Sequence, residues 1–204
     1  MTDLARLIDE GVVTDPDSAK GRLLREARQL FKVKGFTKTT VRDIAAAVGI
    51  LSGSIFHHFP NKEDILRCVM EETIRVSLAR LKSELEGVDT TEDQIRTLIR
   101  CELDAIYGRE GQDFTILVSE WRSLNTASQA KVLEFREVYE NLWHQVFNDA
   151  QAQGMSPLGG VVLRGFVRGA LVDTINWYKP DGKLSLEQLA EQVYLAFFGR
   201  SASL

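Results

Sequence analysis

Small hydroxyl residues and scattered basic residues gather between residues 38 and 62. The run Ser52-Gly53-Ser54 is followed by His57, and Lys38, Arg42 and Lys62 lie on either side of it. Hydroxyl groups, backbone N–H groups and basic side chains are the usual donors to phosphate oxygens, and a helix N-terminus favours an anion. If these residues share one face, the chemistry they offer is phosphate binding.

Two short helices joined by a tight turn are predicted to position them. Thr40 is a typical N-cap, and Asp43, three residues later, completes a capping box. Gly49 can adopt the left-handed conformation that ends a helix. The apolar residues between these signals recur at helical spacing and are Ile44, Ala45 and Val48.

The second helix is predicted to begin near Leu51 or Ser52 and to end at His58. Ile55 and Phe59 are four residues apart, so one face can pack on the first helix and leave the small polar residues facing outward. This is the pattern of a helix-turn-helix, whose second helix enters the DNA major groove N-terminus first. Small residues in an ordinary, tightly packed helical hairpin are the alternative.

The distribution of charge favours DNA. Residues 18–62 hold nine Lys or Arg and two acids, a net charge of +7, although the whole chain has a net charge of −4. Residues 63–204 have a net charge of −7 and the first 17 residues one of −4. A basic segment on an acidic body is the electrostatic pattern expected of a protein that binds phosphates at one end.

The segment from residue 20 to about residue 66 resembles the DNA-binding signature of TetR-type bacterial repressors. The resemblance rests on Thr-Val-Arg-Asp-Ile-Ala from Thr40, on Val-Gly-Ile-Leu-Ser-Gly-Ser-Ile-Phe-His-His-Phe-Pro-Asn-Lys-Glu-Asp-Ile-Leu from Val48, and on the upstream spacing Leu24, Ala27, Phe31, Gly35-Phe36. It implies an operator-DNA partner. The candidate DNA-binding residues are Lys38, Thr39, Thr40, Arg42, Ser52, Gly53, Ser54, Phe56, His57 and Lys62.

Two residues depart from that signature. Leu51 stands where a Ser usually begins the recognition helix, and Phe56 stands where a Tyr hydroxyl usually holds a phosphate. The operator contact assigned to that hydroxyl is therefore in doubt for this chain.

In the rest of the chain, the apolar residues recur at helical spacing and no strand-like alternation of useful length is present. The predicted fold class is therefore all-α, with about nine helices. We expect an N-terminal arm over residues 1–17, a three-helix DNA-binding domain over 18–65, and a helical ligand-binding and dimerisation domain over 66–204. Boundaries within the body are predicted from a Thr91–Gln94 capping box, from Ser156-Pro157 as the start of a helix ending near Trp177, and from a Ser185–Gln188 capping box.

Two helices near the C-terminus are apolar on almost every side. Only Arg164, Arg168 and Asp173 are charged between Leu158 and Trp177. A helix that is apolar all round must be buried all round, and in a chain of this size a second subunit is the expected cover. TetR-like proteins dimerise through the corresponding helices; two central helices of a monomer are the alternative. The candidate dimer-interface residues are Gly165, Gly169, Val172, Val193 and Phe197.

Aromatic residues on the body helices are candidates for an effector pocket, although plain core is the alternative. They are Tyr107, Trp121, Trp143, Phe147, Phe166 and Trp177. The segments 49–54 and 176–185 resemble regulators of fatty-acid and steroid catabolism, which implies a small hydrophobic effector such as an acyl-CoA. Basic residues that could meet the CoA group are Arg109, Arg122, Arg164 and Arg168; for the last two, intersubunit or intrahelical ion pairs are the alternative.

Other classes of function find little support in the sequence. Gly49–Gly53 lacks the single-residue spacing of a nucleophile elbow and follows no strand. His57 and His58 are adjacent and cannot both face one metal, so no catalytic residue, metal or cofactor is expected. No run of 18 apolar residues is present, and Cys68 and Cys101 fit free thiols in a reducing cytoplasm.

The sequence therefore predicts a cytoplasmic, homodimeric, ligand-responsive transcriptional repressor that binds double-stranded operator DNA and does not insert into membranes. A repressor that senses drugs or other aromatic ligands is the alternative. A helical lipid carrier or adaptor without DNA binding would leave the basic segment unexplained.

Overall fold

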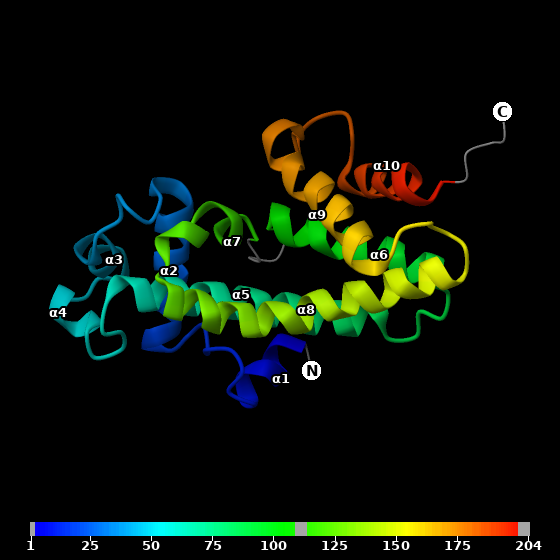
Figure 1. Cartoon of the computed structure of the whole chain (residues 1–204). Coiled ribbons are helices and arrows are strands. Elements are labelled where there is room, and N and C mark those ends of the chain that lie inside the picture. The colour runs from blue at the N-terminus through cyan, green and yellow to red at the C-terminus, as the bar shows by residue number, and fades with distance from the viewer. Residues whose placement is uncertain (1–2, 109–113, 200–204) are drawn as a thin grey trace. The chain divides into compact units, whose positions relative to one another are not determined.

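The computed structural model describes residues 3–108 and 114–199, which form ten α-helices, one short 3-10 helix and no strand (Figure 1). This confirms the all-α fold that the sequence predicted, with about nine helices. The chain forms two compact units. Unit 1 comprises Met1–Val76 and Phe114–Arg136, and unit 2 comprises Ser77–Asp113 and Glu137–Leu204. This grouping differs from the predicted ranges because two long helices contribute residues to both units.

Unit 1 is built around the predicted DNA-binding helices. Its elements are α1 (Asp3–Asp9), α2 (Ala19–Lys34), α3 (Val41–Val48), α4 (Ser52–Ile55), α7 (Thr115–Ser119), the 3-10 helix η1 (Trp121–Ser123) and the first parts of α5 (Lys62–Leu85) and α8 (Thr126–Ala152). Its core includes Leu23, Leu24, Phe31, Ile44, Ile55, Phe59, Ile65 and Leu66. Burying this apolar surface is the main force that holds the short helices α3 and α4 in place.

The N-terminal arm is folded onto unit 1. Leu7 and Val13 are buried. The backbone N–H of Thr14 donates to Glu72 over 3.0 Å, and the guanidinium of Arg75 donates to the carbonyl of Val12 over 3.1 Å. Two α5 side chains thus bind the backbone of the segment that follows α1.

Unit 2 contains α6 (Thr91–Tyr107), α9 (Gly160–Trp177), α10 (Leu186–Phe198) and the remaining parts of α5 and α8. Helix α6 packs against both α9 and α10. The core residues of this unit include Ile95, Leu98, Ile99, Leu103, Trp143, Phe147, Leu163, Val167, Leu171 and Leu189. The apolar faces recognised in the sequence therefore meet inside one helical unit.

Several helix ends differ from the predicted ones. The capping residues of α6 are Thr90 and Asp93, one position before the predicted pair. Helix α9 begins at Gly160, because the Gly160 N–H donates to Asn148 Oδ1 of α8 over 3.0 Å and a Cβ at this position would lie only 2.5 Å from that oxygen. Before α8 the chain forms two short helices, α7 and η1, rather than one continuous helix.

No helix among the described residues is both long and apolar enough to cross a membrane.

Candidate DNA interface and effector site

The turn between α3 and α4 is fixed by the two caps that the sequence predicted. The Thr40 hydroxyl accepts from the Asp43 N–H over 3.1 Å, and Asp43 Oδ2 accepts from the Thr40 N–H over 2.8 Å. Gly49 ends α3 in the left-handed conformation, with φ 76° and ψ 34°, and Ile50 N–H closes back onto the Ala45 carbonyl. This geometry sets the direction in which α4 leaves α3.

Helix α4 is shorter than predicted. It ends at Ile55, and the chain continues through Phe56 to His58 with i→i+3 backbone hydrogen bonds. Ile55 and Phe59 are buried against the core of unit 1, as their spacing predicted, whereas Gly53, Phe56 and His57 are exposed and Ser52 and Ser54 are half-buried. The outward side of the segment thus carries the small polar residues.

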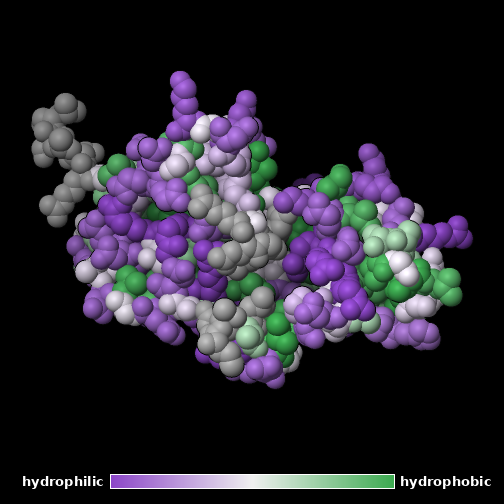
Figure 2. All heavy atoms as spheres, turned by 180° about the vertical axis from the view of Figure 1, so that it is seen from behind, coloured by the Kyte–Doolittle hydropathy of each residue, from purple (hydrophilic) through white to green (hydrophobic). Residues whose placement is uncertain are grey.

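Exposed apolar side chains accompany them. Leu51 is 80% exposed and Phe56 is 55% exposed. Figure 2 shows apolar residues gathered at the end of unit 1 that carries α3 and α4 in Figure 1. An exposed apolar surface at a helix end is unusual and indicates a site that contacts a binding partner.

The predicted hydroxyl and basic residues fall into two groups. Lys38 and Arg42 are exposed. Thr39, by contrast, is fully buried and its hydroxyl donates to the Gly35 carbonyl over 2.8 Å, while Thr40 is committed to the α3 cap. The exposed pair can reach an external phosphate, and the two threonines act on the local backbone.

Lys62 is bound to the backbone that precedes α3. Its Nζ donates to the carbonyls of Phe36 and Thr39, each over 2.7 Å, and lies 4.0 Å from the centroid of the Phe36 ring. Partial burial lowers the pKa of Lys62, and the charge of Glu120 works against that shift. Its ammonium therefore fastens α5 to the turn between α2 and α3.

Glu120 completes the support of that turn. Its carboxylate accepts from the Phe36 N–H over 3.2 Å and from the Ser123 hydroxyl over 3.0 Å. The sequence gives no signal for this contact, because Glu120 and Phe36 are 84 positions apart and a lone acid between two short helices fits no local pattern.

The predicted effector aromatics occupy different environments. Trp143 and Phe147 are fully buried and meet edge to face at 5.4 Å between ring centroids. Tyr107 lies against Tyr178 at 5.0 Å. Phe166 and Trp177 are 57% and 54% exposed, and Trp121 belongs to unit 1 rather than unit 2.

A buried ionic cluster lies beside Trp143. Arg164 of α9 pairs with Glu102 of α6 at 2.8 Å and with Glu140 of α8 at 2.6 Å, and its guanidinium lies 4.0 Å from the centroid of the Trp143 ring. The Tyr139 hydroxyl donates to Glu102 over 3.2 Å. Burial alone would lower the pKa of Arg164, but the two carboxylates keep it above its ordinary value. Arg164 thus joins three helices of one subunit, whereas the sequence suggests intersubunit or intrahelical ion pairs for it.

One donor atom of this cluster, Arg164 Nη1, has no hydrogen-bond partner in the described structure. A buried polar atom without a partner costs free energy. Of the other basic residues considered for a CoA group, Arg122 is exposed in unit 1, Arg168 is half-buried and Arg109 lies outside the described residues.

One side of α9 and α10 remains apolar and exposed. Gly165 and Gly169 are exposed, and a Cβ built on either would meet no atom of the subunit within 4 Å. Val172 and Phe197 are half-buried, and Val193 is buried. The exposed large apolar residues of these helices are Val161, Val162, Phe166, Ile175, Trp177 and Leu195.

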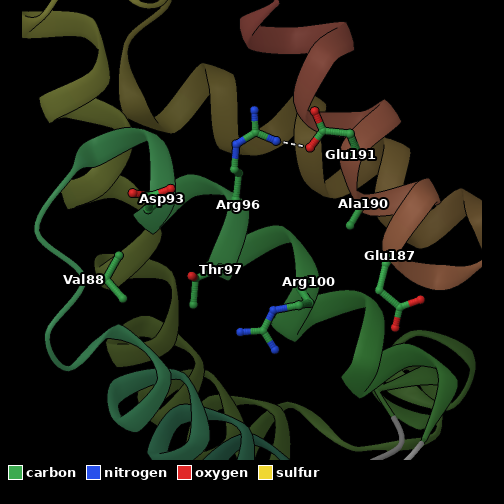
Figure 3. Close-up of a pocket in the computed structure, with 8 residues that line it drawn as sticks. All are labelled: Val88, Asp93, Arg96, Thr97, Arg100, Glu187, Ala190 and Glu191. Carbon is green, nitrogen blue, oxygen red and sulfur yellow. Dashed lines mark hydrogen bonds and ion pairs between the residues drawn. The ribbon is translucent and has the colours of Figure 1, made fainter.

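An open cavity of about 260 Å³ lies between the first turns of α6 and α10. Figure 3 shows Arg96 and Glu191 pointing toward each other across it, where they form an ion pair. Its other charged residues are Asp93, Arg100 and Glu187, and Arg100 is paired with Glu84 at 2.6 Å. Ligand pockets for apolar molecules are larger and mostly apolar, so this cavity is a poor candidate for the effector.

Comparison with known proteins connects these features to a family. Residues 23–69 match the model of bacterial regulatory proteins of the tetR family, and residues 88–199 match the tetracyclin repressor-like C-terminal domain. The HTH-type transcriptional repressor KstR2 of Mycolicibacterium smegmatis is 31% identical, over 90% of both chains.

Three solved structures share the fold over almost the whole chain. A structure described as superantigen pfit is 47% identical and superposes with a TM-score of 0.82 over 96% of both chains. AibR, solved with isovaleryl coenzyme A and operator DNA, is 22% identical with a TM-score of 0.82, over 89% of this chain and 99% of AibR. The ketosteroid transcriptional regulator KstR2 of Mycobacterium tuberculosis is 25% identical with a TM-score of 0.76, over 92% and 98% of the two chains.

Both halves of the chain thus match family models of one kind, and the N-terminal match covers the whole α3–α4 pair. The chain belongs to the TetR family of bacterial regulatory proteins.

Proposed function

We propose that this protein is a homodimeric repressor that places α4 of each subunit in the major groove of a pseudo-palindromic operator and is released by a small CoA thioester. The observation that carries the DNA part is the α3–α4 pair itself. Its outward side offers small polar residues and two exposed cations, Lys38 and Arg42, on a segment of net charge +7. Such a surface fits the phosphate contacts that hold a recognition helix in the groove.

The test of DNA binding starts from a random duplex library. The full chain should enrich an inverted repeat whose half-sites are about one helical turn apart or more, and the affinity should fall steeply with salt. Arg42→Ala should weaken binding to all duplexes alike. A chain that enriches no sequence and shows no salt-dependent binding would favour the helical carrier or adaptor instead.

The class of effector is supported by relatives and by chemistry. KstR2 is described as a ketosteroid regulator and AibR was solved with isovaleryl coenzyme A. In this chain, Arg164 Nη1 is a buried donor without a hydrogen-bond partner, on a guanidinium that stacks on the Trp143 ring. A thioester or keto oxygen is the kind of acceptor that would satisfy it. Release further requires that the effector bind the released state more tightly, typically by about 1–3 kcal/mol.

The effector is best tested by comparing three kinds of compound. Operator release should be measured with acyl-CoA thioesters of increasing size, with the matching free acids and with a hydrophobic dye. The chain has three tryptophans, so the double variant Trp121→Phe/Trp177→Phe keeps Trp143 as its single indole. Trp143 is fully buried beside Arg164, and a change in its fluorescence would report a ligand bound there. Release by CoA thioesters with a change in Trp143 fluorescence supports the proposal. Release by the dye alone would replace it with a multidrug-type sensor.

A further inference from the structure

The side chain of Leu51 contributes no capping hydrogen bond and no core packing to the fold. Leu51 is the N-cap of α4, with extended dihedral angles, and its side chain makes no capping hydrogen bond. It is also 80% exposed, so it is not part of the core. Ser, Thr, Asp and Asn stabilise an N-cap, whereas Leu does not. A residue that breaks a local rule without a gain in packing marks a functional position.

The neighbouring residues lack the usual readers of bases. Bidentate recognition in the major groove uses Arg or Lys for guanine and Asn or Gln for adenine. The segment from Gly49 to Pro60 contains none of these four residue types. Just beyond it, the Asn61 amide donates to Asp64 over 2.8 Å and Lys62 is bound to two carbonyls. Ser52, Ser54 and His57 can each make single hydrogen bonds, but bidentate readout is not available to this segment, so apolar contact becomes the more discriminating chemistry.

Apolar contact supplies that chemistry. The C5 methyl group of thymine projects into the major groove and is the one apolar feature that distinguishes a base pair there. The residues at the N-terminal end of a recognition helix are those that approach base edges. Leu51 is at this end, and it continues the surface that carries the predicted phosphate contacts.

We infer that Leu51 is a specificity-determining residue that reads a thymine methyl group in each operator half-site. The inference rests on the proposed operator binding and adds the base that is read. The occupant of the exposed apolar surface is thus the groove of duplex DNA. Contact with the methyl group buries both apolar partners and discriminates thymine from cytosine, which has no methyl group at this position.

The experiment replaces thymine by deoxyuridine, which lacks only the methyl group. The operator selected with the full-length wild-type chain is resynthesised with each thymine changed in turn, and the affinity of the wild-type chain and of Leu51→Ala is measured for each duplex. We expect at least one substitution per half-site to weaken wild-type binding by about fourfold. The same substitution should leave the affinity of Leu51→Ala unchanged, since two changes that remove the same interaction are not additive.

Two further variants separate recognition from folding. Leu51→Ser restores a capping side chain, so it should raise the unfolding temperature while losing the response to deoxyuridine. Val33→Ala is the matched control, because Val33 is 71% exposed but lies on α2. It should keep the wild-type response.

The outcomes are distinct. A wild-type affinity that no deoxyuridine substitution changes, or a Leu51→Ala variant with the wild-type response, overturns the inference while leaving operator binding intact. A chain that selects no duplex overturns the proposed function and this inference together.

Discussion

The carboxylate of Glu120 and the backbone N–H of Phe36 are joined by a hydrogen bond of 3.2 Å, although the two residues are 84 positions apart in the chain. The carbonyl of the same Phe36 accepts from Lys62 over 2.7 Å. Both polar backbone groups of Phe36 are therefore held by charged side chains from other elements. The turn that precedes the helix-turn-helix thus depends on residues that follow it by 26 and 84 positions.

The first prediction concerns this turn. Glu120→Ala should leave the Phe36 N–H without its acceptor and increase its rate of hydrogen exchange by about tenfold, the equivalent of one ordinary hydrogen bond. Glu120→Gln keeps an oxygen acceptor and should change that rate less. Amide exchange read residue by residue is the measurement. An unchanged Phe36 rate in the alanine variant would mean that the bond does not protect the turn.

The second prediction concerns Arg42 and Lys62, both of which the sequence predicts to bind DNA. Arg42 is exposed, so Arg42→Ala should lower the slope of log affinity against log salt by about one for each phosphate that Arg42 neutralises. Lys62 serves two carbonyls, so Lys62→Ala should mainly lower the free energy of unfolding, by about 1–2 kcal/mol. Salt titrations and denaturant unfolding of both variants check this. A reduced salt slope in Lys62→Ala with unchanged stability would return Lys62 to the DNA interface.

The third prediction is a pH dependence of the α3 cap. The hydrogen bond from the Thr40 backbone, then those from the Thr40 side chain and Lys34, lower the pKa of Asp43 from its ordinary 3.8 to about 2. A carboxylate with a lowered pKa stabilises the fold above its unfolded value and loses that effect as pH falls through the folded value. The unfolding temperature of wild type should therefore exceed that of Asp43→Asn at pH 5, and the difference should shrink between about pH 4 and pH 2. A constant difference over this range would contradict the cap.

Local signals in the sequence predicted what local physics decides. Thr40, Asp43 and Gly49 define α3 because caps act within four residues, and Ile55 and Phe59 face inward because their spacing matches a helix turn. Contacts between distant segments carry no such signal. This is why the sequence assigned Lys62 to phosphate, missed Glu120 and left the partner of Arg164 open. The end of α4 was also misplaced, since the backbone changes to i→i+3 hydrogen bonds after Ile55 and no capping residue marks this point in the sequence.

The fourth prediction tests the ionic cluster of unit 2. Arg164→Leu leaves Glu102, which is 2% exposed, without its charge partner, and should cost about 3–5 kcal/mol of stability. Adding Glu102→Gln to this variant removes the unpaired charge and should recover part of the loss. Urea unfolding of the two variants and of wild type gives the comparison. If the free energy of unfolding of Arg164→Leu lies within about 1 kcal/mol of the wild-type value, water reaches the cluster and solvates Glu102.

The last prediction concerns Gly165 and Gly169, at which the packing of the subunit does not require a glycine. A Cβ at Gly165 or Gly169 would meet nothing within 4 Å, so Gly169→Ala should leave the fold intact and, by helix propensity, add up to about 1 kcal/mol to its stability. If the exposed face of α9 packs on a second copy, a larger side chain there keeps the two helices apart. Gly169→Leu should then sediment as a monomer while keeping the helix content of wild type. Leu is chosen because it adds no charge that could disturb the subunit, and Val118→Leu, on an exposed position of α7, serves as the control. A Gly169→Leu protein that remains a dimer would move the interface away from this face, and Phe166→Glu, on the same side of α9, would then also leave the dimer intact.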